Sequence, residues 1–189
     1  LAARGPDFDA SGAAHGGWSA NAWSGSVDAL QNQGRYAFAL QAPAPLRLAP
    51  APGAGVMGLA SPERIALGSA VFKLSDGSIS LQSLDKEGAR WSTKGAAAGV
   101  PLTYLAQLSP ALRENASGDL ALGAQWALDL QGAAGAAPAL SGMLHVFRER
   151  GDLIVGAEGV VLGLRLLDLR ADVVGDALRL QMELDGTRA

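Results

Sequence analysis

The sequence contains no cysteine and has few charged or aromatic residues. Without cysteine, the chain cannot form a disulfide, a thiolate nucleophile or a zinc–cysteine site. Charged residues make up 17% of the chain, below the usual quarter, whereas hydrophobic residues make up 49%. A monomer rarely exposes large apolar patches without a functional reason. The hydrophobic surplus therefore has to be buried or used at a binding surface.

Long hydrophobic runs and an excess of positive charge are missing as well. No window holds 18 consecutive apolar residues, so the sequence predicts no membrane-spanning helix. The net charge is −3 and the basic residues are scattered, which argues against a nucleic-acid partner. The chain begins at Leu1 without a positively charged leader. We interpret it as a piece of a longer protein whose signal peptide or membrane anchor would lie outside this sequence.

The strongest pattern that is present is strict alternation of apolar and polar residues. The run from Leu120 to Leu130 and the run from Leu178 to Leu184 both place apolar side chains at every second position. Shorter runs with the same period occur around Phe38, Phe72 and Val146. Successive side chains of a strand point to opposite faces, so each run predicts a strand with one apolar and one solvated face. This is the pattern of antiparallel sheets.

Turn signals separate these runs. The dipeptide Gly-Asp precedes a strand-like run at positions 118, 151 and 175, and Asp76-Gly77 does the same. Glycine and aspartate tolerate the backbone angles that tight hairpins require. The spacing of these phrases is irregular, so the chain is a series of hairpins and not a solenoid of fixed period.

Three segments depart from the alternation. Residues 42–58 contain four prolines and several glycines, which predicts a loop or an edge segment. Residues 101–114 carry leucines at helical spacing, and Pro110 limits them to one or two short helices. Residues 1–22 are rich in glycine, alanine and serine and remain strand or coil. Together these features predict a single all-β unit over residues 1–189 with one or two short helices.

Candidate chemistry is sparse. Gly53 to Gly58 matches G-x-G-x-x-G, but proline surrounds it where a dinucleotide site needs a strand and a helix, so we interpret it as a flexible loop.

The two histidines, His15 and His145, are far apart, and His145 alternates with apolar neighbours and should face solvent. Four carboxylate pairs lie two to four positions apart: Asp7/Asp9, Asp85/Glu87, Asp168/Asp172 and Glu183/Asp185. They fit a solvated strand face better than an acid–base pair. We therefore expect no enzyme activity, no metal and no cofactor.

Several phrases resemble the TamB family of AsmA-like envelope proteins, and together they cover most of the chain from about residue 23. The phrases are Trp23-Ser-Gly25, residues 36–48, residues 77–81, residues 91–95, Val100-Pro-Leu-Thr-Tyr-Leu105, residues 118–126, residues 140–142, residues 150–153 and residues 175–186. Each phrase is short, and their order along the chain carries the resemblance. The family has no catalytic motif to transfer.

The resemblance implies a long curved antiparallel sheet in the form of an open U-shaped trough, a β-taco, with an apolar concave face. It also implies a protein anchored in the inner membrane of a Gram-negative bacterium that crosses the periplasm. Its partners would be phospholipid acyl chains, adjacent β segments of the same full-length chain and a TamA-like outer-membrane barrel of the Omp85 type. Its roles would be phospholipid transport between the two membranes and outer-membrane protein assembly.

The alternating runs provide the residues expected to line a lipid groove. These are Leu120, Leu122, Trp126, Leu128, Leu130, Leu164, Leu166, Leu178, Leu180, Met182 and Leu184. The same alternation also fits an assembly chaperone or adhesin-like β-protein that binds other strands by edge pairing. A closed sandwich with a dry core would favour that alternative, and an open groove would favour lipid binding. The sequence leaves open the strand order, the lipid head group and the direction of transport.

Overall fold

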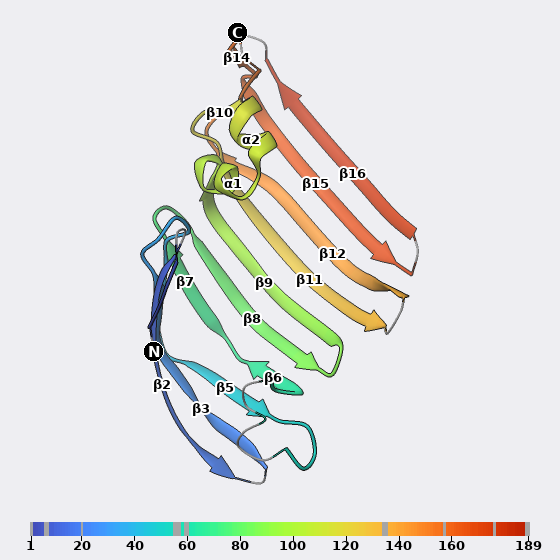
Figure 1. Cartoon of the computed structure of the whole chain (residues 1–189). Helices are drawn as coiled ribbons and strands as arrows, with labels where there is room; N and C mark the ends of the chain where they lie inside the picture. The colour runs from blue at the N-terminus through green and yellow to red at the C-terminus, as the bar shows by residue number, and fades with distance from the viewer. Residues whose placement is uncertain are drawn as a thin grey trace.

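The protein is mostly β-sheet, as seen in a computed structural model that describes residues 2–5, 8–19, 21–54, 58, 61–133, 136–156, 158–175 and 177–187. One large curved antiparallel sheet, not closed into a barrel, runs through the molecule, with two short helices near one end of its strands (Figure 1). This confirms the predicted all-β curved trough.

The large sheet contains thirteen strands among the described residues. They are β1 (Ala2–Arg4), β2 (Asp9–Ser19), β3 (Ala22–Asn32), β4 (Phe38–Leu40), β5 (Ala44–Ala49), β6 (Arg64–Leu67), β7 (Ala70–Leu74), β8 (Ser78–Glu87), β9 (Arg90–Pro101), β11 (Ala121–Ala133), β12 (Ala136–Arg150), β15 (Leu164–Val174) and β16 (Ala177–Gly186). A small second sheet joins β10 (Ala116–Ser117), β13 (Ile154–Val155) and β14 (Val160–Val161).

Strand order follows the chain closely, because most neighbours are joined by short turns. The order is β1-β2-β3-β4-β7-β8-β9-β11-β12-β15-β16, and every pair is antiparallel. Glycines with positive φ occupy turn positions, as at Gly77 between β7 and β8 and Gly175 between β15 and β16. Two-residue turns with positive φ match the twist of the flanking strands.

The sheet bends along a crease in its N-terminal half. There two short strands, β4 and β5, lie end to end, and both pair with β3. On their other side lie two more short strands end to end, so that β4 pairs with β7 and β5 pairs with β6. The registers of β2 with β3 and of β8 with β9 also shift, at Ala13/Ala14 and at Leu81/Ser83. Bulges and breaks of this kind increase local twist and curvature. We attribute the turning of the N-terminal strands away from the rest, visible in Figure 1, to this crease.

Within residues 42–58, the prediction of a loop or edge was wrong for β5. This strand pairs with β3 on one side and with β6 on the other. Pro45 is tolerated because it lies just beyond the residues that pair with β6. Its carbonyl accepts a hydrogen bond from the N–H of Gly68 at 2.9 Å, and Gly68 has no Cβ to collide with the proline ring. Residues 55–57 of this segment lie outside the described residues.

The N-terminal residues form strands although their sequence showed weak periodicity. Both β1 and β2 belong to the large sheet, and β2 pairs with β3 from Ala10 to Ser19. Gly16 lies opposite Gly25, where a Cβ on either residue would collide with the ring of Trp23. Small residues are therefore required in this part of β2, and they hide the alternation that marks the other strands.

The helices lie where the sequence predicted them. They are α1 (Leu102–Leu108) and α2 (Pro110–Asn115), and Ser109 between them accepts a hydrogen bond from the N–H of Leu112 as the N-cap of α2. The hydroxyl of Tyr36 donates to the carbonyl of Gln107 at 3.1 Å, which ties α1 to the loop after β3. Burial raises the pKa of Tyr104 in the same helix. Neither helix of the described chain is long enough to cross a membrane.

In the part of the chain that the structure describes, no second layer covers the large sheet. Among the described residues only nine apolar side chains besides proline are buried, four of them alanines. The accessible surface of the protein is 11551 Å², whereas a compact monomer of 19.2 kDa would expose about 8,400 Å². The main packed cluster is small and lies by the helices, where Leu102, Leu120 and Leu164 meet. Most of the large sheet is therefore a single sheet with both faces accessible.

Candidate apolar trough

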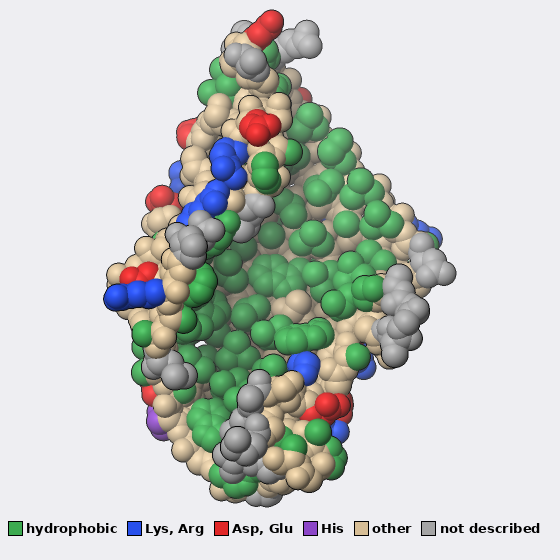
Figure 2. Space-filling view, in the orientation of Figure 1, with side chains coloured by type: hydrophobic (Ala, Val, Ile, Leu, Met, Phe, Trp, Pro, Cys, Tyr) green, Lys and Arg blue, Asp and Glu red, His purple; other side chains and the backbone are tan. Residues whose placement is uncertain are grey.

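One face of the large sheet is apolar and the other is polar. Side chains that lie directly opposite each other in an antiparallel pair share a face, so the register traces each face across the strands. Figure 2 shows the apolar face as a hollowed surface of hydrophobic side chains, with charged groups gathered mainly along its borders. We call the two surfaces the apolar face and the polar face.

Cross-strand rows make up the apolar face. The middle row crosses ten strands through Gly16, Gly25, Leu46, Leu67, Leu84, Thr93, Leu128, Gly142, Val173 and Leu178. A second row contains Ala70, Leu81, Gly95, Trp126, Leu144, Ala171 and Leu180. A third contains Leu40, Phe72, Ile79, Ala97, Ala124, Val146, Leu169 and Met182. At about 4.8 Å per strand, the middle row extends about 43 Å along the curved sheet.

A fourth row, which we call the rim row, lies close to the hairpin turns at one end of the strands. Its members are Trp18, Trp23, Leu48, Ile65, Lys86, Trp91, Leu130 and Leu140. Three of the four tryptophans of the chain are in this row. Lys86 is its only charged member, and the Lys86 Nζ atom lies 5.9 Å from the centroid of the Trp91 ring.

Polar atoms within the apolar face are satisfied locally. The fourth tryptophan, Trp126, donates its indole N–H to the Thr93 hydroxyl at 3.2 Å. Asn32, at the end of β3, accepts N–H groups from Asp9 and Gly34 and donates to the carbonyl of Tyr36. These contacts remove the cost of holding unpaired polar groups among apolar side chains.

The apolar face becomes more exposed toward β16. Leu178, Leu180, Met182 and Leu184 are between 55% and 67% exposed, although each is apolar and each points to the apolar face. In a single sheet, a side chain is covered only by its neighbours on the two adjacent strands, and among the described strands β16 has a neighbour on one side only. This part of the face is a large exposed apolar patch of the kind that marks a binding surface.

A shallow apolar hollow occurs at the opposite edge of the sheet. It encloses about 510 Å³ and is lined by small side chains of β1, β2 and β3, with Val27, Leu30 and Leu46 as its larger members. Its lining contains no charged residue. The apolar surface therefore continues to the N-terminal strands.

The polar face carries the ion pairs of the sheet. Arg90 binds Asp129 through Nε, at 2.8 Å, and through Nη2. Arg64 binds Glu87 at 2.6 Å, and His15 lies 2.7 Å from Asp28. The hydrogen bond from Arg90 lowers the pKa of Asp129. These pairs are exposed to water on the polar face. Each one therefore contributes little to the free energy of unfolding.

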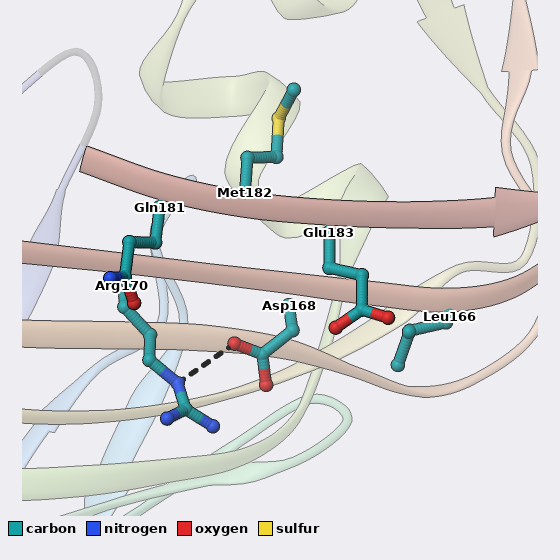
Figure 3. Close-up of a pocket in the computed structure, with 6 residues that line it drawn as sticks. All are labelled: Leu166, Asp168, Arg170, Gln181, Met182 and Glu183. Carbon is teal, nitrogen blue, oxygen red and sulfur yellow. Dashed lines mark hydrogen bonds and ion pairs between the residues drawn. The ribbon is translucent and has the colours of Figure 1, made fainter.

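The polar face of β12, β15 and β16 also holds a small cluster around Asp168 (Figure 3). The Asp168 carboxylate lies 2.7 Å from His145 Nε2 and accepts a hydrogen bond from Arg170 Nε at 3.0 Å. The bond to His145 is the main reason that the pKa of Asp168 is lowered. Glu183 lies on the same side, whereas Met182 projects from the other side of the strand. This cluster has the composition of a solvated strand face.

Most residues predicted to line the groove lie together on the apolar face. Trp126, Leu128 and Leu130 of β11 share it with Leu178, Leu180 and Met182 of β16 through the rows given above, and Leu184 follows Met182 on the same face of β16. Leu120 and Leu164 are buried in the cluster beside the helices, and Leu122 packs against that cluster. Leu120 and Leu164 are therefore part of this packed core and do not line an open groove as predicted, and Leu122 lies beside them.

Leu166 was wrongly predicted to share this face. It lies opposite Asp185 and has the same orientation as Asp168 and Arg170, on the polar face (Figure 3). The cause is a register shift between Leu164 and Leu166, which changes the face of every later residue of β15. Leu167 is the residue that reaches the apolar side, where it packs against the Leu102–Leu120–Leu164 cluster and lies opposite Leu184.

The remaining motifs occupy structural positions. The glycine-rich segment that begins at Gly53 follows strand β5 through a turn, and its residues 55–57 lie outside the described part of the chain. His145 lies on the polar face as predicted, but it is partly buried against Asp168. In the part of the chain that the structure describes, no group of three or more His, Cys, Asp or Glu side chains could hold a metal ion.

The sequence interpretation missed the N-terminal half of the trough and its charged members. Alternation is weak in β2 and β3, so Trp18 and Trp23 were not assigned to a face. Among the described strands, the only charged residues that the register places on the apolar side are Lys86 and Arg148. In each strand the charged residue occupies a position where the alternation of apolar and polar residues predicts an apolar side chain. The sequence alone could therefore have identified both residues.

Comparison with known proteins does not assign the chain to a family. No family model, curated protein or solved structure matches this chain.

Proposed function

We propose that the apolar face binds the acyl chains of phospholipids and that the chain is a segment of a lipid conduit. The observation that carries the proposal is the uninterrupted middle row, ten strands wide, on a sheet with no second layer. A soluble domain normally buries such a surface in its own core. Here the surface is open, so an apolar ligand is the simplest way to cover it.

The energetics suit acyl chains. Each methylene removed from water contributes about 0.8 kcal/mol, and the trough is longer than the roughly 15 Å that an acyl chain spans in one leaflet of a bilayer. Such binding needs no specific polar contact. It is also compatible with movement, because neighbouring positions along the rows have similar chemistry.

The resemblance to the TamB family extends this proposal to a place in the cell. In that setting the chain lies in the periplasm as part of a protein anchored in the inner membrane of a Gram-negative bacterium. It supports phospholipid transport between the membranes and outer-membrane protein assembly, together with a TamA-like Omp85 barrel. Adjacent β segments of the same full-length protein would continue the sheet. No catalytic role, metal or cofactor forms part of this proposal.

The alternative function is a chaperone or adhesin-like protein that binds other strands at its edges. A closed sandwich with a dry core would support that alternative, whereas an open trough supports lipid binding. The described sheet is curved and open, with its apolar face accessible. We therefore favour the lipid-binding function.

Leu128→Arg tests the proposal, because Leu128 lies within the middle row with paired strands on both sides. We expect this charge to reduce photo-crosslinking of the chain to a phospholipid with a diazirine in its acyl chain by at least fivefold, since a buried charge opposes acyl binding. Gln125→Arg is the matched control, because Gln125 lies on the polar face of the same strand, opposite His145. Mass spectrometry of co-purifying lipids gives a second measurement.

Two results would contradict the proposal. The first is equal crosslinking by the unaltered chain, Leu128→Arg and Gln125→Arg. The second is the absence of lipid from the unaltered chain in both measurements. Leu128→Ala guards against misfolding of the arginine variant, and it should lower crosslinking less because it adds no charge.

A further inference from the structure

We propose that Lys86 and the tryptophans of the rim row form a head-group site for lipids that carry a phosphate. This inference rests on the proposed acyl binding and adds a preference to it. The trough would hold the acyl chain, and the phosphate would lie at the rim beside Lys86.

The position of Lys86 is the first observation. Lys86 lies between Ile65 and Trp91 in the rim row, one residue before the last pair of the β8–β9 hairpin. Its side chain is half-buried, and its Nζ atom lies 5.9 Å from the centroid of the Trp91 ring. Lysine at the border of an apolar surface covers that surface with its stem and keeps its charge hydrated.

The charge of Lys86 is not neutralised by an ion pair among the described residues. Its Nζ atom donates to the carbonyl of Pro62 at 2.6 Å, which uses one of three donors. The carboxylates next to it in β8, Asp85 and Glu87, lie on the polar face, and Glu87 is paired with Arg64. At least one donor and the full positive charge therefore remain for an anion.

Arg148, the other positively charged residue that the register places on the apolar side, is engaged by the protein itself. Arg148 donates to the carbonyls of Gly151 and Arg165, and its charge contributes to the lowered pKa of Asp152. These contacts hold the connection between β12 and β15 beside the helices. Arg148 is therefore structural, and of the two cations that the register places on the apolar side of the described strands, Lys86 is the one without an ion pair or an acidic electrostatic partner.

The tryptophans provide an independent observation. Trp18, Trp23 and Trp91 belong to the same row as Lys86, and both Trp18 and Trp91 are 38% exposed. Tryptophan prefers the boundary between hydrocarbon and water, where its ring is apolar and its N–H stays hydrated. A row that combines tryptophan with one lysine matches the boundary between the acyl chain and the phosphate of a lipid. Among the described strands, the register places no carboxylate in this row, and the charge of Lys86 favours an anionic group there.

The test compares two ligands that differ only in the phosphate: 1-dodecanoylglycerol and 1-dodecanoylglycerol 3-phosphate. Binding of each is measured by calorimetry and by tryptophan fluorescence. The variants are Lys86→Met, which keeps the length of the stem, Lys86→Arg, which keeps the charge, and Lys94→Met as the control. Lys94 lies on the polar face, opposite Ala127.

We expect the unaltered chain to bind the phosphate ligand more tightly. Lys86→Met should weaken that binding about three- to tenfold, the range for a charge-assisted contact at a partly exposed site. It should leave binding of dodecanoylglycerol unchanged. Lys86→Arg should restore the preference, and Lys94→Met should not affect it.

The remaining outcomes overturn the inference in different ways. Equal binding of both ligands, with Lys86→Met behaving like Lys94→Met, would reject the head-group site and leave acyl binding intact. Loss of both ligands in Lys86→Met would show that Lys86 supports the fold. Binding of neither ligand by the unaltered chain would reject acyl binding and the head-group site together.

Discussion

At the residue scale, the contact between Gly95 and Trp126 shows how closely the apolar face is packed along its centre. The Trp126 ring lies against the backbone of β9, where a Cβ on residue 95 would be 2.5 Å from Trp126 Cζ2 and 2.7 Å from the carbonyl of Ser80. Real Cβ atoms do not approach other atoms so closely. The glycine is therefore needed for the tryptophan to lie flat and to donate to Thr93.

Gly95→Ala should lower the free energy of unfolding by about 1–3 kcal/mol, because the added methyl group forces the ring or the strand to move. Urea unfolding followed by circular dichroism measures the change. Gly17→Ala is the control, since a Cβ at Gly17 would have no heavy atom within 4 Å. That variant should stay within about 0.5 kcal/mol of the unaltered chain. Equal destabilisation by the two variants would contradict the role given to Gly95.

The face of each residue could be predicted from the sequence only where the period of two is unbroken. In β11 and β16 the alternation continues without interruption on the apolar side, and the predicted residues there share a face. In β15 the shift after Leu164 reverses the assignment, so Leu166 was placed wrongly. A bulge depends on pairing with a neighbouring strand, and a single strand sequence does not contain that information.

At the element scale, β16 is an unprotected edge of the sheet among the described strands. It is ten residues long, contains no proline and bonds only to β15. None of its charged side chains points to the apolar face, since Arg179, Glu183 and Asp185 all alternate to the other side. Natural edge strands usually carry a proline, a bulge or an inward charge that prevents pairing with another chain.

We therefore predict concentration-dependent dimers that pair through residues 177–185. Met182→Lys should shift sedimentation-velocity profiles toward the monomer, because it places a charge on the apolar side of the edge. Glu183→Lys is the control, since residue 183 lies on the polar face of the same strand. A strict monomer at every concentration tested, or an equal effect of the two lysines, would contradict this prediction.

The kind of element could be predicted better than its partners. Antiparallel strands and the short helices between residues 101 and 115 follow from period, proline and turn residues. The crease could not be predicted, because it depends on how the four short strands β4, β5, β6 and β7 pair with one another between β3 and β8. The pairing of β10 with β13 could not be predicted either, because a strand of two residues is too short to show an alternating pattern.

At the scale of the whole molecule, the open single sheet gives the protein an extended shape. A compact domain of 189 residues would have a radius of gyration of about 16 Å. We expect small-angle X-ray scattering of the monomer to give a larger value, because the curved sheet has no second layer to fold against. Met182→Lys at low concentration serves as the sample in which association is suppressed. A radius near 16 Å would show that the trough closes in solution.

The order of the strands also determines how such a trough can change in length. Each strand of the large sheet bonds only to strands that are close to it in the chain, through antiparallel pairs. An added hairpin would contribute two strands at about 4.8 Å each and would lengthen the sheet by about 10 Å without rearranging the others. Stability in such an array is close to a sum of local terms. Duplication or loss of single hairpins therefore offers evolution a route to match the span of a trough to the distance it has to cover.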